Sequence, residues 1–222
     1  MFATSFLDLP PLQSASGSVT LPASVGFFGP CGAVDEVQIL KNGAKLLTAA
    51  PQGASASFNV KLNDGDVVQG DGWNVEAVHT PGHISNHLCF AVKEDRALLS
   101  GDHVMGWSTA VISPPDGSMG DYFASLRKLL PRDETLYIPT HGAEIRNPGP
   151  FVQAYIEHRL GREAQIMARL KEGPQTVPHM VAKNYADTPV HLHAAAGRSM
   201  LAHLVQMVKD GRVRTDDGQA RI

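Results

Sequence analysis

Three short apolar stretches of the sequence each end at a turn that carries a histidine. The turns are His79-Thr80-Pro81-Gly82-His83, Ser100-Gly101-Asp102-His103 and Ile138-Pro139-Thr140-His141-Gly142. Glycine and proline end strands, and a rigid strand end can present an imidazole or a carboxylate into a shared cavity. Five of the ten histidines lie between residues 79 and 141. The sequence therefore predicts a sheet whose strand ends build one polar site.

The segments around these turns have the patterns of strands and one helix. Residues 73–78 alternate between apolar and polar side chains, as a half-buried strand does. Further strands are expected at residues 25–28, 88–92, 96–100 and 136–139, and turns containing glycine separate short β-type stretches between residues 34 and 66. Apolar residues at positions 122, 123, 126, 129 and 130 predict a helix.

The composition changes at residues 147–150, where two prolines and a glycine occur together. Pro150 opens a predicted helix that runs to about Lys171. Helices at about 176–185 and 194–209 and a hairpin over 212–221 follow, which is the order of a winged helix. We therefore expect two domains, at residues 1–147 and 148–222.

Charge and cysteine usage exclude several classes of protein. With 43% hydrophobic and 18% charged residues the chain can bury a core, and a net charge of −3 argues against a polyanion-binding protein. Residues 1–150 hold nine Lys and Arg against fifteen Asp and Glu, whereas residues 151–222 hold ten against seven. Two cysteines without a CxxC pair, no basic residue before Lys41 and no long apolar run predict a cytoplasmic protein that does not span a membrane.

Imidazole and carboxylate groups together form the ligand set of a catalytic zinc ion, with iron or manganese as alternatives. The runs that carry them are TPGHISNHLCF, LLSGDH and YIPTHG. They resemble the third, fourth and fifth metal motifs of the metallo-β-lactamase superfamily, in order and at suitable separations. The segment GDHVMGWST, followed by PPDG, resembles one branch of it. That branch comprises lactamase-like hydrolases with a C-terminal winged helix, among them a ribonuclease of animal mitochondria.

This resemblance implies an α/β fold, the αββα sandwich, followed by a small winged-helix-like α+β domain. It also implies that His83 is a ligand of the first metal, Asp102 the bridging carboxylate and His141 a ligand of the second. His79 and His87 are expected to support the ligands or to pack rather than to bind metal.

Two residues next to these motifs, His103 and Trp107, are not expected to bind metal. His103 follows Asp102 directly, so in an extended backbone it points away from the site and is structural. Trp107 is expected in the wall of the substrate cleft or in the core, because burial is the common fate of an aromatic side chain.

The defining motif of the superfamily, His-x-His-x-Asp-His, is absent from this sequence. The segment that matches its position by spacing places Thr4, Phe6 and Leu9 where the family has histidines, and retains only Asp8. Asp8 is then a candidate metal ligand and proton acceptor, or else an ordinary residue of an N-terminal loop. With His83 and Asp102 at one position and Asp8, Asp102 and His141 at the other, we expect one bound ion at most.

In the family, strands and a helix precede this motif, and the sequence begins within the strand that leads into it. The sheet is therefore expected to be incomplete at the N-terminus. A mis-assigned or truncated start, a degenerate relative and a partner chain that completes the sheet all remain open, and a homo-oligomer is one form of the last.

Three functions are compared on this basis. The first is a metal-dependent hydrolase of reduced capacity, in which activated water attacks an ester, thioester or phosphodiester of a small molecule or RNA. The second is a non-catalytic relative that acts, if at all, through binding. The third is nucleic-acid binding by the winged helix through Arg212, Arg214 and Arg221. We do not favour DNA binding, and we interpret Arg159, Arg162 and Arg169 as a solvated helix face.

Overall fold

The computed structural model describes residues 19–26, 37–42, 44–49, 55–70, 73–215 and 220–221. Asp8, Thr4, Phe6 and Leu9 lie outside the described residues, so their predicted roles are untested. The strand expected at residues 25–28 falls partly outside them, and the described strand β1 covers Val19–Gly26.

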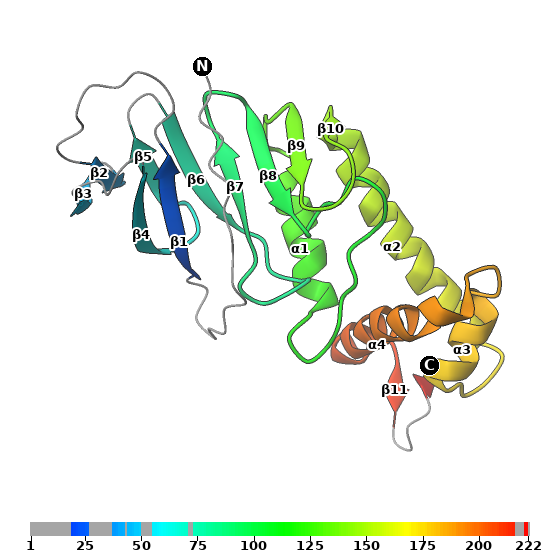
Figure 1. The fold of residues 1–222 in the computed structure, drawn as a ribbon. Coiled ribbons are helices and arrows are strands. Elements are labelled where there is room, and N and C mark those ends of the chain that lie inside the picture. The colour runs from blue at the N-terminus through cyan, green and yellow to red at the C-terminus, as the bar shows by residue number, and fades with distance from the viewer. Residues whose placement is uncertain are drawn as a thin grey trace.

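An eight-stranded mixed sheet fills one side of the fold, and the helices α2 to α4, within residues 148–209, lie toward the other side (Figure 1). Its order is β10-β9-β8-β7-β6-β5-β2-β3, and β8–β9 is its parallel pair. The strands are β2 (Val37–Lys41), β3 (Ala44–Ala49), β5 (Val67–Gly70), β6 (Trp73–His79), β7 (Leu88–Val92), β8 (Ala97–Gly101), β9 (Leu136–Pro139) and β10 (Ile145–Arg146). Separately, β1 pairs in antiparallel orientation with β4 (Ser55–Leu62). The strands predicted over residues 73–78, 88–92, 96–100 and 136–139 are confirmed to within one residue.

Helix α1 (Met119–Leu129) covers one face of the sheet. It begins three residues before the predicted helix because the Ser118 side chain caps it by accepting a hydrogen bond from the Asp121 backbone N–H. Its apolar side packs on alternate residues of the strands, and the shared core contains Val78, Cys89, Ala91, Leu98, Tyr122, Leu126, Leu129 and Tyr137. Side chains on one face recur every two residues along a strand and about every 3.6 residues along a helix. The apolar faces of the strands and of α1 therefore meet in this core.

Helix α2 (Pro148–Leu170) belongs to two hydrophobic cores. Its first half contributes Val152, Tyr155 and Ile156 to the core beneath the sheet, and its second half contributes Ile166 and Leu170 to a second core. That second core also contains residues of α3 (Val177–Asn184) and α4 (His193–Lys209). A 3-10 turn (Val190–Leu192) and the hairpin β11 (Arg214–Thr215) and β12 (Ala220–Arg221) complete this region. The cores separate within α2, and the expected boundary at residue 147 remains a prediction.

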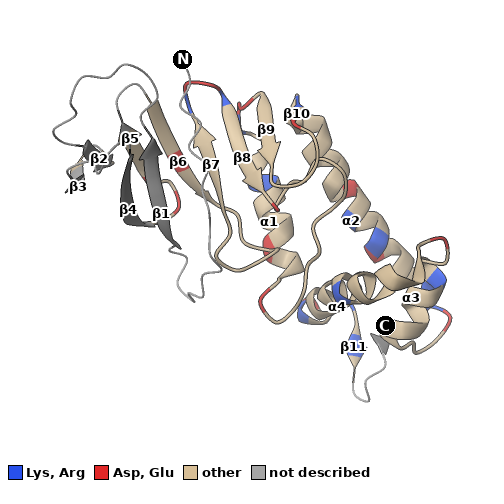
Figure 2. Ribbon diagram, in the orientation of Figure 1, with Lys and Arg blue, Asp and Glu red and all other residues tan. Residues whose placement is uncertain are grey.

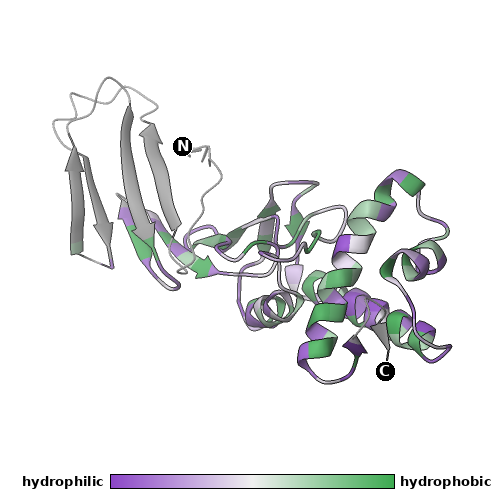
Figure 3. Cartoon of the chain, turned by 90° about the horizontal axis from the view of Figure 1, so that it is seen from below, coloured by the Kyte–Doolittle hydropathy of each residue, from purple (hydrophilic) through white to green (hydrophobic). Residues whose placement is uncertain are grey.

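The interpretation of Arg159 as part of a solvated helix face is wrong. Its side chain is 3% exposed, donates a hydrogen bond to the Ala110 carbonyl and lies over the ring of Tyr122. The physical reason is the helical period, because position 159 follows 152 and 155 on the apolar side of α2. Figure 3 shows that the helices of the chain carry both hydrophobic and hydrophilic residues along their lengths.

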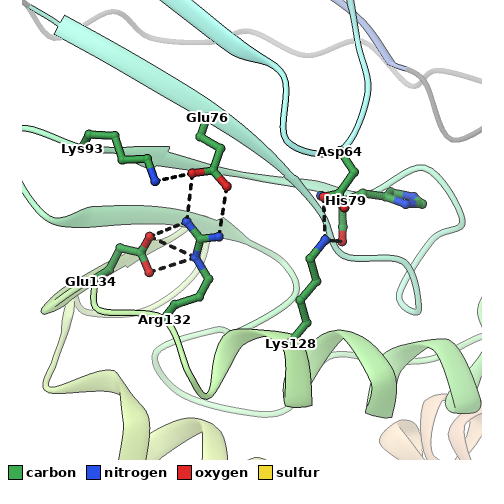
Figure 4. Close-up of polar contacts among 7 residues, drawn as sticks. All are labelled: Asp64, Glu76, His79, Lys93, Lys128, Arg132 and Glu134. Atoms are coloured by element: carbon green, nitrogen blue, oxygen red, sulfur yellow. Dashed lines mark hydrogen bonds and ion pairs between the residues drawn. The ribbon is translucent and has the colours of Figure 1, made fainter. Parts of the chain in front are cut away.

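A cluster of charged side chains ties the end of α1 to the sheet (Figure 4). Arg132 donates to Glu76 (3.1 Å) and to Glu134 (2.6 Å), and Lys93 also pairs with Glu76. Burial acts to raise the pKa of the Glu76 carboxyl, but hydrogen bonds and charge from Arg132 and Lys93 outweigh it, so the pKa lies below 4.5. The cluster therefore favours the folded state wherever Glu76 is ionised.

Replacing Glu76 with glutamine should lower the free energy of unfolding at neutral pH by about 1–3 kcal/mol, since charge-assisted hydrogen bonds are lost. A carboxyl whose folded pKa is depressed stabilises the protein above its unfolded pKa, here 4.5, and loses that contribution as the pH falls through the folded value. The difference between wild type and variant in urea unfolding should therefore shrink below pH 4.5. Glu144→Gln, at an exposed side chain, should change stability by less than about 0.5 kcal/mol. A difference independent of pH would contradict this account of Glu76.

Candidate metal centre

The sheet topology brings the three predicted site turns to one edge of the sheet. Strands β6 and β8 both pair antiparallel with β7, and β9 pairs parallel with β8. Strands β6, β8 and β9 therefore run in the same direction and end at the same edge of the sheet. The turns after them carry His83, Asp102 and His141, so residues 58 positions apart in the sequence meet there.

The Asp102 carboxylate lies between the two histidines. Its Oδ2 is 3.8 Å from Nε2 of His83, and its Oδ1 is 3.6 Å from Nε2 of His141. The three side chains are partly exposed, at 28% for His83, 34% for Asp102 and 57% for His141. Each carboxylate oxygen thus faces one imidazole, at the edge of a solvent-accessible site.

The orientation of His83 is set by a backbone carbonyl. Its Nδ1 is 2.6 Å from the carbonyl oxygen of Val111. Because a carbonyl only accepts, Nδ1 carries a proton, so Nε2, which faces Asp102, is the nitrogen of His83 that can bind a cation. Unless a proton or a cation lies between them, Nε2 of His83 and Oδ2 of Asp102 are two acceptors that face and repel each other.

The donor set fits a divalent cation in two further respects. Asp102 Oδ1 is buried and accepts no hydrogen bond. Two donors bound to the same tetrahedral zinc ion at about 2.1 Å lie about 3.4 Å apart, close to the separations seen on either side of Asp102.

The number of donors is small. One carboxylate oxygen of Asp102 and the imidazole that faces it make one possible metal position, and the other oxygen and imidazole make a second. Each position thus has two protein donors, where a catalytic zinc usually has three. Within the described ranges, no group of three or more His, Cys, Asp or Glu side chains is arranged to hold a metal ion. The predicted third donor, Asp8, lies outside them.

His79 and His87 contact other residues of the turn that carries His83. The ring of His79 contacts the Ser85 carbonyl at 3.0 Å, and its backbone is held by Asp64 and Lys128 (Figure 4). His87 Nδ1 bonds the Thr80 hydroxyl at 2.8 Å. Burial, with smaller effects of His83 and His79, lowers the pKa of His87 to about 4, so this ring is neutral. Their supporting role toward the metal ligands remains a prediction.

His103 and Trp107 differ sharply in their exposure to solvent. His103 is fully buried, with its ring 4.8 Å from that of Tyr122, in line with its predicted structural role. Trp107 is 75% exposed, so the expectation of a core position is wrong, and its place in a cleft wall remains a prediction. The preceding Gly106 donates its N–H to the His141 carbonyl (2.8 Å), so the tryptophan loop joins the histidine loop.

Sequence reasoning missed Val111 and Arg159. The Val111 contact is made by a backbone carbonyl and leaves no trace in residue type. The burial of Arg159 could have been predicted, because it lies four residues after Tyr155 within the apolar stripe of α2.

Comparison with known proteins adds independent support for the architecture. Residues 22–141 match the model of the metallo-beta-lactamase superfamily, and residues 176–221 match that of the beta-lactamase-associated winged helix domain. The first match covers more than half of the chain. Among the residues described, no helix is long and apolar enough to cross a bilayer.

Two animal proteins and one solved structure illustrate the similarity. The "Beta-lactamase-like protein 2 homolog" of Caenorhabditis elegans is 35% identical over 153 residues, which are 68% of this chain and 50% of that protein. The homolog in Drosophila melanogaster is 35% identical over 147 residues, 65% of this chain and 49% of that protein. A metallo-beta-lactamase family protein of Thermus thermophilus superposes with a TM-score of 0.64 at 21% identity, covering 72% of this chain and 53% of that one. The chain thus spans about half the length of the relatives it matches.

Proposed function

Because this chain belongs to the metallo-β-lactamase superfamily and carries its winged helix domain, we propose that it is a metal-dependent hydrolase whose centre is built on His83, Asp102 and His141. The observation that carries the proposal is the pair of imidazoles facing opposite oxygens of one carboxylate, one of which is a buried acceptor without a hydrogen bond. Zinc suits these donors best, with iron or manganese as alternatives. One bound ion per chain is the proposed occupancy.

A divalent cation held there supplies a Lewis acid that brings the pKa of a water molecule toward about 7. The protein residues have separable tasks. His83 and His141 would contribute imidazole nitrogen donors and Asp102 carboxylate oxygens, and the Val111 carbonyl keeps the His83 ring in one orientation. Asp8 is proposed as the additional ligand and proton acceptor. An ester, thioester or phosphodiester of a small molecule or RNA is the proposed substrate class.

The second candidate function is a non-catalytic relative that acts through binding. It is favoured by one observation: in the described part of the chain, each position beside Asp102 has only two protein donors, one carboxylate oxygen and one imidazole. Replacing Thr4, Phe6 and Leu9 with histidine separates the two candidates. Hydrolysis that appears only after this restoration would support the non-catalytic interpretation.

The proposal is tested by metal content and hydrolysis together. Freshly purified wild-type protein should hold about one zinc, iron or manganese per chain by elemental analysis and should hydrolyse at least one of a p-nitrophenyl ester, a thioester and a phosphodiester. His141→Ala should lower both metal content and rate about ten-fold or more, since it removes a direct donor. His191→Ala, at an exposed histidine of the C-terminal region, is the matched control and should change neither. Wild-type protein without metal and without hydrolysis would contradict the proposal.

DNA binding by the winged helix is not proposed. Lys and Arg occur on α2, α3, α4 and β11 (Figure 2), but several of the arginines have partners within the protein. Arg162 stacks on the ring of Tyr185, Arg169 pairs with Glu172, and Arg212 pairs with Glu163. A homo-oligomer and a cytoplasmic location remain proposals.

A further inference from the structure

The segment Ala110-Val111-Ile112, called here the 110–112 segment, connects the metal centre to the C-terminal helices. Its central carbonyl, that of Val111, accepts the hydrogen bond from Nδ1 of His83 at 2.6 Å. The segment lies between β8 and α1 and is not itself part of a helix or strand. Something else must therefore hold the carbonyl in place.

The two residues beside Val111 are each held by a helix from the C-terminal part of the chain. The Ala110 carbonyl accepts a hydrogen bond from the guanidinium of Arg159 on α2. The Ile112 backbone N–H donates to the hydroxyl of Ser199 on α4, at 3.3 Å. All four residues are buried, with exposures of 2%, 3%, 0% and 7% for Ala110, Arg159, Ile112 and Ser199.

The bond from Ser199 acts on the same rigid group as the bond from His83. The Val111 carbonyl and the Ile112 N–H belong to one peptide unit, which is planar. A hydroxyl that fixes the N–H therefore also fixes the direction of the carbonyl, which points the opposite way within the same plane. Arg159 fixes the preceding peptide unit, so the two helices hold both planes that meet at Val111.

Helix α2 holds the flanking loop as well. The hydroxyl of Tyr155, one helical turn before Arg159, shares its single proton between the carbonyls of Met105 and Ser108. The Arg159 guanidinium also lies over the Tyr122 ring, and the Tyr122 hydroxyl donates to the His103 carbonyl at 2.8 Å. The loop that follows Asp102 is thus bonded to the C-terminal helices at several successive points.

We propose that Arg159 and Ser199 are positioning residues for His83, and that they act through the 110–112 segment to keep its ring in the Nδ1–H tautomer with Nε2 toward Asp102. The inference that this orientation serves metal binding rests on the proposed function. The inference that Arg159 and Ser199 fix the His83 ring does not. The C-terminal helical region is therefore a structural component of the metal centre.

The test uses metal-free, full-length protein labelled with ¹⁵N-histidine, at about pH 8.5, where an ordinary imidazole with a pKa of about 6.5 is neutral. The ¹⁵N shifts of the His83 ring, assigned by their loss in His83→Gln, report its tautomer. Wild type should be predominantly Nδ1–H. In Ser199→Ala and in Arg159→Met the ratio should move toward Nε2–H by about five-fold, which corresponds to about 1 kcal/mol.

Two variants separate positioning from general loss of stability. Ser199→Thr keeps the hydroxyl and should restore the wild-type ratio. Thr176→Ala removes the hydroxyl that caps α3 in the same region, without a contact to the 110–112 segment, and should leave the ratio unchanged. If Arg159→Met does not fold, Ser199→Ala and Arg159→Lys carry the measurement. An unchanged tautomer in folded Ser199→Ala would overturn the inference.

A zinc titration of the same proteins distinguishes failure of the inference from failure of the proposed function. Ser199→Ala should bind zinc about ten-fold more weakly than wild type, as loss of outer support for a metal-binding histidine does, and Ser199→Thr should bind normally. If wild type binds no zinc while the tautomer still shifts in Ser199→Ala, the positioning stands and the metal-dependent function falls. Equal zinc affinities with equal tautomers would reject the positioning alone.

Discussion

Replacing Asp102 with asparagine should weaken zinc binding more than replacing either histidine of the centre. His83→Ala and His141→Ala each leave one imidazole facing one carboxylate oxygen, because the two rings lie on opposite oxygens. Asp102→Asn removes the negative charge and one oxygen, so at most one side keeps an oxygen donor, and that donor is neutral. Even outer-shell changes cost about 10- to 100-fold in metal affinity, so we expect a loss of more than about 100-fold.

Asparagine is the informative substitution because it retains the size of the aspartate and leaves no cavity. Asp95→Asn, in the exposed turn that leads into β8 at the opposite edge of the sheet, removes the same charge and is the control. Isothermal titration with zinc gives the affinities of all four variants. If Asp102→Asn bound zinc as tightly as the two histidine variants, Asp102 would not be shared between two positions, and the centre would need a different set of ligands.

The strands and the site turns could be predicted because both depend on local sequence. Alternation over residues 73–78 and the glycine and proline beside His83 and His141 are determined by side chains within a few positions. The order of the strands could not be predicted in this way. The pairing of β2 with β5, and the parallel pair β8–β9, join segments far apart in the chain.

The errors in the predicted side-chain environments have a common cause. The charge of Arg159 predicts a solvent-exposed side chain, yet a buried guanidinium is stable where it bonds a carbonyl and lies over an aromatic ring, as it does at Ala110 and Tyr122. The large aromatic ring of Trp107 predicts a position in the core or in a cleft wall, yet the side chain is exposed on a loop that the backbone hydrogen bond of Gly106 holds. Residue type alone does not report such contacts, because they depend on the packing of distant segments.

A contact between backbones also holds the turn that carries His83. Gly82 has a φ of +141°, and a Cβ added there would lie 2.4 Å from Cα and 2.6 Å from the backbone nitrogen of Tyr122 in α1. The Gly82 carbonyl accepts the Ser118 N–H at 2.9 Å, which keeps the turn against the first residues of that helix. Neither obstacle is a flexible side chain, so the helix or the turn must move to admit a methyl group.

Gly82→Ala should therefore destabilise the protein by about 2–6 kcal/mol, from a strained backbone (about 1–3 kcal/mol) and overpacking (about 1–3 kcal/mol). For a chain of this size the midpoint of thermal unfolding should fall by about 5–20 °C. Gly161→Ala is the matched control, because no atom lies within 4 Å of its added Cβ and the position is helical. Alanine there should raise stability by about 0.5–1 kcal/mol. Equal melting temperatures for Gly82→Ala and wild type would mean that the turn does not pack against α1, and His83 would then lack the support on which the whole centre depends.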